Sequence, residues 1–136
     1  MEEQLRGALL YLIAWQADRV VGRVSVEWTE RNTSSFIERR GLPGIFGLEV
    51  LPEHRGAGIG RALMLAVERE LLARGFDSVW LDTGVNEDYA AGRRLYDRLG
   101  YRRLGGDYVI SARVPADVKA DRPWLDIVFQ MTKRLR

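Results

Sequence analysis

Three glycines in five residues, at positions 56, 58 and 60, are the feature that most limits how this chain can fold. They lie between an apolar run that ends before Pro52 and a stretch with helical periodicity. Each glycine in the first turn of a helix costs roughly 1 kcal/mol relative to alanine, and a tight turn needs only one. We therefore expect a strand-to-helix junction whose backbone is kept bare so that a ligand can reach it.

The start of the helix after these glycines is suited to binding an anion. The first amides of a helix have no acceptor within the helix and carry the positive end of its dipole. A mononucleotide-binding loop would have Lys and then Ser or Thr after the last glycine, where Arg61 and Ala62 stand. A dinucleotide-binding loop needs a GxGxxG pattern, whereas this chain has GxGxG. The alternative without a ligand is a plain, tightly packed turn.

Apolar periodicity along the chain predicts an α/β fold. Strands are expected at residues 10–15, 20–28, 45–51, 78–83, 108–114 and 125–132, with a loop at 29–44 that contains a helical turn at 36–40. Helices are expected at 60–74 and 88–99, closed by Gly75 and Gly100. Their predicted buried stripes are Leu63, Val67 and Leu71 in the first helix and Ala91, Leu95 and Leu99 in the second. This order predicts a mixed sheet with helices on its faces, built as a single domain over residues 1–136.

Composition excludes several kinds of site. The chain has no cysteine and one histidine, His54, which leaves no thiolate nucleophile and no zinc cluster, so we expect no metal. Its 21 Lys and Arg against 19 Asp and Glu leave a net charge of +2, which gives no support for binding nucleic acid. The acidic start and the short apolar run at 9–15 predict neither a secretory signal nor a membrane span. A cytoplasmic protein without a membrane partner is the expectation.

Two motifs resemble the GNAT superfamily, the GCN5-related N-acetyltransferases. The family signature is Arg or Gln, two residues, Gly, one residue, then Gly or Ala, and it is matched by Arg55-Gly56-Ala57-Gly58-Ile59-Gly60. A second stretch, residues 95–101, is similar to the family's Leu-Tyr, three residues, Gly, aromatic element. The resemblance covers about Tyr11 to Leu135 and implies the GNAT acyl-CoA N-acyltransferase fold. The fold would be shortened at its N-terminus, because only nine residues precede the first predicted hairpin, where the family has a strand and two helices.

The resemblance implies acetyl-CoA as the cosubstrate. In the family, the loop amides hold the coenzyme A diphosphate, and the preceding strand pairs with the pantetheine arm along an edge left open where it splays from the next strand. The residues implied for these contacts are Leu48, Val50, Arg55, Gly56, Gly58, Ile59, Gly60 and Arg61. Asn86 is a further candidate for the pantetheine arm. Tyr89 and Gly92 stand where the family usually has Asn and Ala.

Acyl transfer to an amine sets the requirements for the catalytic residues. An amine of pKa about 10.4 must lose its proton, which requires roughly 4–5 kcal/mol from a base or a desolvated site at pH 7. Without cysteine, direct attack in a ternary complex is favoured over an acyl-enzyme. Strand alternation places Glu49 on the face opposite Phe46, Leu48 and Val50, so Glu49 is the candidate base, and an ion pair with an arginine is the equally weighted alternative. Asp82, on the neighbouring predicted strand, is a second candidate carboxylate.

Tyr96 and two residues before the 29–44 loop complete the candidate site. The resemblance implies that Tyr96 protonates or hydrogen-bonds the departing sulfur, while a tyrosine that simply packs on the sheet is the alternative. Glu27 and Trp28 could orient a cationic acceptor by charge and by cation–π contact, although Trp28 in the core is the simpler interpretation. His54 is interpreted as a loop residue, since Gly58 stands where an HxxxD acyltransferase motif needs Asp.

The sequence therefore predicts an acetyl-CoA-dependent N-acetyltransferase that acts on a primary amine of a small molecule. A protein or peptide N-acetyltransferase and a non-catalytic coenzyme A binding module are the alternatives. The wall that the family's N-terminal helices give to the acceptor site would be absent, rebuilt by residues 29–44, or supplied by a second subunit, so a homodimer is compatible with the sequence.

Overall fold

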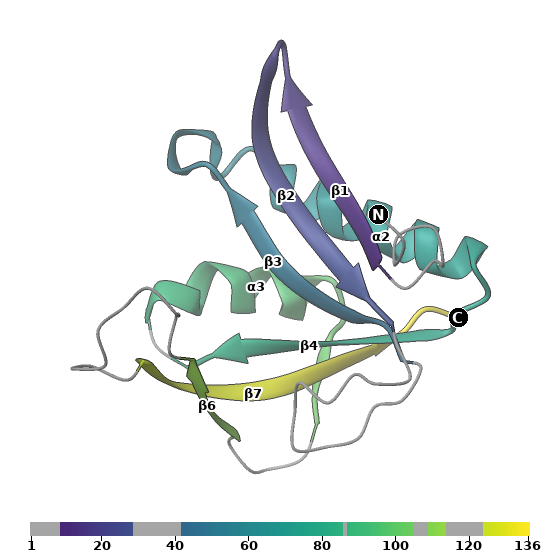
Figure 1. Ribbon diagram of the computed structural model, residues 1–136, viewed down its shortest axis with the longest axis vertical. Coiled ribbons are helices and arrows are strands. Elements are labelled where there is room, and N and C mark those ends of the chain that lie inside the picture. Colours follow the sequence, from purple (N-terminus) through teal and green to yellow (C-terminus); the bar gives the residue numbers. More distant parts are fainter. Residues whose placement is uncertain (1–8, 29–41, 86, 105–108, 114–123) are drawn as a thin grey trace. The chain divides into compact units, whose positions relative to one another are not determined.

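A computed structural model describes residues 9–28, 42–85, 87–104, 109–113 and 124–136, with residues 109–113 and 124–128 described by their backbone alone. The chain forms two compact units, one of residues 1–81 with 133–136 and the other of residues 82–132. Strands β4 and β7 run from one unit into the other. The elements of the described residues are β1 (Leu9–Gln16), β2 (Arg19–Glu27), β3 (Gly44–Val50), η1 (Pro52–His54), α2 (Ile59–Ala73), β4 (Ser78–Gly84), η2 (Glu87–Tyr89), α3 (Ala90–Arg98), β5 (Arg102–Arg103), β6 (Val109–Arg113) and β7 (Trp124–Arg134) (Figure 1).

The strands pair in both directions, which confirms the predicted mixed sheet. In the first unit β1 and β2 form an antiparallel hairpin, β2 pairs antiparallel with β3, and β3 pairs parallel with β4 at Gly44 and Ile45. In the second unit β7 pairs antiparallel with both β5 and β6. The order of hydrogen-bonded neighbours is β1-β2-β3-β4-β7-β5, and β6 is attached to β7.

Helix α2 forms the core of the first unit with one face of strands β1 to β3 (Figure 1). The predicted stripe of Leu63, Val67 and Leu71 is buried, together with Met64. The strands supply alternate valines that are 1% exposed or less, namely Val24 and Val26, with Val21. Burial of each such side chain contributes roughly 1.5–3 kcal/mol, so this interface holds the helix in place on the sheet.

One charged pair also belongs to this core. Glu68, in the middle of α2, is 7% exposed, and its Oε1 lies 2.5 Å from Nζ of Lys133 near the end of β7. The backbone amide of Leu135 donates to the carbonyl of Asp77 (2.7 Å). Residues 133–136 are therefore fastened to the first unit both by a paired charge and by the backbone.

Both helices end at the glycines that the sequence indicates. Gly75 has φ +90° and donates to the carbonyl of Leu72, while the amide of Phe76 donates to the carbonyl of Leu71. Gly100 also has φ +90°, and the next residue, Tyr101, donates in the same way to the carbonyl of Tyr96. These are the two hydrogen bonds of a Schellman cap, which needs a left-handed residue after the helix.

The structure differs from the sequence prediction at several places. The short strand β5 was not expected, because two consecutive arginines carry no alternating apolar pattern. Helix α3 begins at Ala90 rather than 88, after the turn η2, and Ala91 in its predicted stripe is exposed. The other two residues of the stripe are covered, Leu95 being half-buried and Leu99 buried, and Gly92 and Tyr96 beside them are also half-buried. The predicted loop at 29–44 and the segment 115–124 between the last two predicted strands lie largely outside the described residues.

Gly44 allows a test of how tightly the sheet is packed. A Cβ at Gly44 would lie 2.7 Å from two indole carbons of Trp80, whose Nε1 is held by the carbonyl of Leu42. We expect Gly44→Ala to lower the free energy of unfolding by about 1–3 kcal/mol through overpacking. At Gly92 the nearest atom would be at 3.5 Å, so Gly92→Ala should be neutral or stabilising by up to about 1 kcal/mol. Urea denaturation of both variants measures this, and equal effects would contradict the packing at Gly44.

Candidate functional site

The glycine loop is built as the sequence predicts, with positive φ angles at two of its glycines. Gly56 has φ +79° and Gly58, the N-cap of α2, has φ +84°. A Cβ at either position would meet no atom within 4 Å. Glycine is therefore required at these positions by the positive φ angle and not by steric crowding. The open space where a Cβ would lie is accessible to a ligand.

The first backbone amides of α2 have no hydrogen-bond acceptor within the helix. The first helical bond runs from the amide of Ala62 to the carbonyl of Gly58 (3.0 Å), so the amides of Ile59, Gly60 and Arg61 precede the ladder. Gly58 offers no side chain as a cap, and the first turn contains no acidic residue. No carboxylate of the first turn therefore neutralises the positive end of the helix dipole, which can bind an anion.

Strand β3 contains a β-bulge that the sequence prediction missed. Between the pairs Ser25 with Phe46 and Arg23 with Glu49, β2 advances two residues and β3 three, and Gly47 in the extra stretch has φ +62°. The bulge interrupts the predicted alternation, because it brings Glu49 to the same face as Phe46, opposite α2. A glycine within a strand pattern is the signal that could have revealed the bulge.

Among the described residues of the first unit, no strand pairs with β3 beyond Ile45 on the edge that faces away from β2. The pairing with β4 covers Gly44 and Ile45 there, and the amide of Leu51 donates to Val21 on β2 (2.8 Å). Since backbone groups alternate along a strand, those of Val50 are directed to the other edge. The Val50 carbonyl accepts a hydrogen bond from Nε of Arg55 (3.0 Å).

Three of the predicted residues line one open groove of about 330 Å³ at the ends of β2 and β3, namely Glu49, Val50 and Arg55. Glu49 forms an ion pair with Arg23, which also lines the groove. Both side chains are about 65% exposed. The sequence did not single out Arg23, because its pairing with Glu49 depends on the strand register. Glu49 thus forms an ion pair with an arginine, as the alternative to a catalytic base predicted. Its role as a base stays a prediction.

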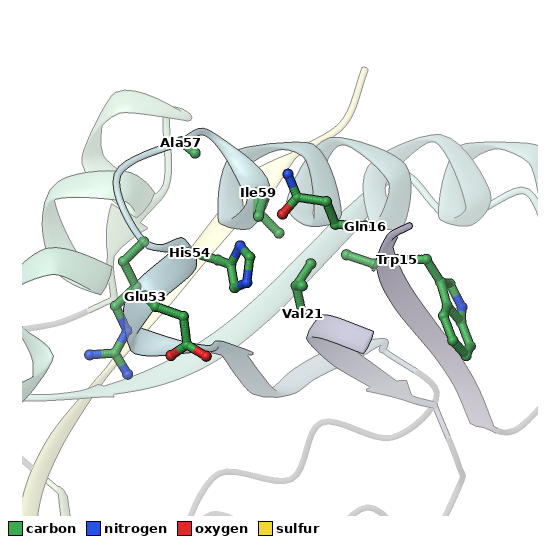
Figure 2. Close-up of a pocket in the computed structure, with 9 residues that line it drawn as sticks. Trp15, Gln16, Val21, Glu53, His54, Ala57 and Ile59 are labelled. Atoms are coloured by element: carbon green, nitrogen blue, oxygen red, sulfur yellow. The ribbon is translucent and has the colours of Figure 1, made fainter. Parts of the chain in front are cut away.

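A second open groove of about 330 Å³ lies between the end of the β1–β2 hairpin and the glycine loop (Figure 2). His54, Gln16 and Ile59 line it, whereas the ring of Trp15 points away from them. Glu53, at its edge, forms an exposed ion pair with Arg19. Its own backbone amide and then the charge of Arg19 lower the pKa of Glu53 below its ordinary value.

Trp28 and Glu27 lie away from the glycine loop. The Trp28 ring packs edge-on against Phe76 (5.4 Å between centroids), and the guanidinium of Arg74 lies 5.8 Å from it. Arg74 and Phe76 follow the C-terminal end of α2, and the 15 residues of this helix span about 22 Å. The guanidinium of Arg74 therefore already makes the cation–π contact that was predicted between Trp28 and a cationic acceptor. Glu27 ends β2, where it pairs with Gly44, and it is half-buried.

The second unit holds Tyr96 and Asp82. Tyr96, on α3, packs edge-on against Tyr101 (6.0 Å), and burial raises the pKa of its phenol above the ordinary value. Asp82 lies half-buried on β4. Gly92 lies beside the ring of Tyr96, where a Cβ would make an ordinary contact, so the alanine usual in the family would fit there as well. Asn86 lies outside the described residues.

The part of the chain that the structure describes contains no group of three or more metal-binding side chains. Among the described residues, no helix has both the length and the apolar character that crossing a membrane requires.

Comparison with known proteins identifies relatives of this chain. It is 37% identical over 87 residues to the mycothiol acetyltransferase of Thermobispora bispora, a match that covers 64% of this chain and 29% of that protein. The fold is similar to that of yncA from Salmonella typhimurium, solved with its cofactor acetyl-CoA (TM-score 0.67, 27% identity, 99% of this chain and 69% of that one). It is also similar to the ribosomal-protein-alanine N-acetyltransferase of Brucella melitensis (TM-score 0.70, 24% identity, 98% and 73%).

The chain spans between 24% and 30% of the length of the curated mycothiol acetyltransferases that it matches. The model of the acetyltransferase (GNAT) family matches residues 2–101, which contain the glycine loop and the Leu-Tyr element. The fold described above and this match together show that the chain belongs to the GNAT acetyltransferase family.

Proposed function

We propose that this chain is an N-acetyltransferase that transfers an acetyl group from acetyl-CoA to a primary amine of a small molecule. The observation that carries the proposal is the bare, left-handed glycine loop before the unsatisfied first amides of α2. This arrangement fits a diphosphate, because several amides converge where no side chain intervenes. The residues in this role are Gly56, Gly58, Ile59, Gly60 and Arg61, with Arg55 beside them.

The open edge of β3 suits the remainder of the cosubstrate. An extended chain with amide groups can pair with a free strand edge as an added strand does. Leu48 and Val50 would offer these backbone groups, once the Arg55 side chain leaves the Val50 carbonyl. The bulge leaves Gly47 and Leu48 opposite a single residue of β2, so one of their backbone amides would be available to the thioester oxygen. When bound, acetyl-CoA supplies the acetyl group as an activated thioester.

Two side chains would move protons. Glu49 accepts the proton that the acceptor amine loses as the carbon–nitrogen bond forms. Tyr96 donates its phenolic proton to the sulfur as the carbon–sulfur bond breaks, a role carried over from the family resemblance. Its raised pKa keeps this phenol protonated at neutral pH, which is the state that a donor needs.

Gly58→Ala tests the diphosphate site. A side chain at φ +84° costs about 1–2 kcal/mol and reorients the amides that begin α2, so coenzyme A should bind at least about tenfold more weakly in calorimetry. Gly75→Ala, at φ +90° beyond the other end of the same helix, is the control, since it should destabilise the fold similarly and leave coenzyme A binding unchanged. Equal binding by Gly58→Ala and the wild type would remove the loop from the proposal.

Glu49→Gln tests the base. Release of coenzyme A thiol with a panel of primary amines should slow about a hundredfold, and the remaining activity should rise with pH as the neutral amine becomes more abundant. Glu53→Gln removes another carboxylate that is ion-paired on the surface and should retain full activity. If both variants behave like the wild type, Glu49 is only an ion-pair partner of Arg23.

Tyr96→Phe tests the donor in two ways. The turnover number should fall about a hundredfold without a change in coenzyme A affinity, whereas Tyr89→Phe should keep its activity. In addition, ultraviolet titration should show that the tyrosinate signal lost in Tyr96→Phe appears at a higher pH than that of an exposed tyrosine. Because the pKa of Tyr96 is higher in the folded state, its contribution to stability is present below pH 10 and is lost as the pH rises through the folded pKa. Full activity in Tyr96→Phe would exclude the donor role.

A further inference from the structure

The face of β1 to β3 that lies opposite α2 carries a row of three side chains across the strands. In the register, Ile13 on β1 lies opposite Arg23 on β2, and Arg23 lies opposite Glu49 on β3. Neighbouring strands are about 4.8 Å apart, so the row spans roughly 10 Å. One end of the row is apolar and the other is an ion pair, an arrangement that matches a small amphipathic molecule.

The ion pair leaves hydrogen-bonding capacity for a ligand. Nε of Arg23 donates to Oε2 of Glu49 (3.1 Å), and Nη2 of Arg23 lies 3.0 Å from the same oxygen in the ion pair. Oε1 of Glu49 accepts no hydrogen bond within the described part of the chain, and Nη1 of Arg23 donates none there. An exposed ion pair contributes little to stability, so admitting a ligand beside it disturbs the fold little. The pair thus presents one acceptor for a cation and one donor for an anion.

Large apolar side chains surround the apolar end of the row. Tyr11, Ile13 and Trp15 follow one another on the same face of β1 and are 55%, 51% and 63% exposed. Val20, opposite Trp15, is also exposed. Single exposed apolar residues are ordinary, but a contiguous group of this kind is typical of a binding surface. In the described residues of the first unit, no other element covers this group.

We propose that this face is the acceptor subsite, and that the acceptor is an α-amino acid with an apolar side chain and a free carboxylate. The inference rests on the proposed function. Oε1 of Glu49 receives the ammonium group, the guanidinium of Arg23 receives the carboxylate, and the ligand's side chain lies on Ile13 between Tyr11 and Trp15. Arg23 is a positioning residue, since it also orients the carboxylate that accepts the proton.

The test uses four ligands that differ only in their charged groups: L-phenylalanine, L-phenylalaninamide, phenethylamine and 3-phenylpropionate. Equilibrium binding to the ¹⁵N-labelled protein is followed by amide shifts with coenzyme A present and absent, which needs no turnover. L-phenylalanine should bind at least about tenfold more tightly than each analogue, because every analogue loses one charge-assisted contact. L-alanine should bind more weakly than L-phenylalanine, because it lacks the apolar contact.

Two arginine variants separate the subsite from general surface charge. Arg23→Gln should abolish the preference for L-phenylalanine over its amide and should raise KM for the amino acid more than it lowers kcat. Arg19→Gln is the matched control, because Arg19 lies on the same strand, is as exposed as Arg23 and is ion-paired with Glu53, but does not line the groove with Arg23. It should keep both the preference and the KM.

The outcomes for the subsite and for the proposed function can be told apart. Absence of binding by L-phenylalanine, equal binding of all four ligands, or equal effects of the two arginine variants would overturn the subsite even if amines are acetylated. Preference for the amide would overturn it in favour of peptide N-termini. Selective binding of L-phenylalanine that depends on Arg23 supports the subsite, and if no thiol is then released from acetyl-CoA, only the transferase function fails.

Discussion

The packing of helix α2 against β1 to β3 is the constraint on which the candidate site depends. The helix is held along its length by Leu63, Val67 and Leu71, and these residues are buried against the valines of β2. Fixing the helix also fixes its first amides beside the end of β3. The loop between them can therefore use left-handed glycines and no capping side chain, because tertiary burial supplies the stability that the helix start lacks.

Strand β3 separates two kinds of chemistry. Its edge beyond Ile45 presents backbone groups, which in the proposed function pair with an extended amide chain irrespective of side chains. Its outer face presents Glu49, which the bulge at Gly47 places beside Arg23 of β2. A single inserted residue thus decides on which face the carboxylate lies. Without the bulge, Glu49 would lie on the side that α2 covers.

Much of the fold could be predicted from the sequence, because its local signals agree with one another. The period of Leu63, Val67 and Leu71 and the glycines at 75 and 100 determine the helices and their ends, and the glycine loop lies where its spacing indicates. The face on which Glu49 lies could not be predicted, since alternation fails at a bulge and the register depends on β2. The tertiary partners of Trp28, at the far end of α2, are likewise invisible to a pattern that runs along one strand.

The pair of Lys133 and Glu68 has a consequence for how the protein is made. The first unit is discontinuous along the chain, because residues 133–136 join residues that precede the whole second unit. The chain is synthesised from its N-terminus, so β1 to β3, α2 and β4 are synthesised well before Lys133. Until then Glu68, which is 7% exposed in the folded unit, lacks that counter-ion. The first unit is therefore the first to be synthesised and the last to be complete, because it includes residues 133–136. Its last segment can join it only after the whole second unit has been translated.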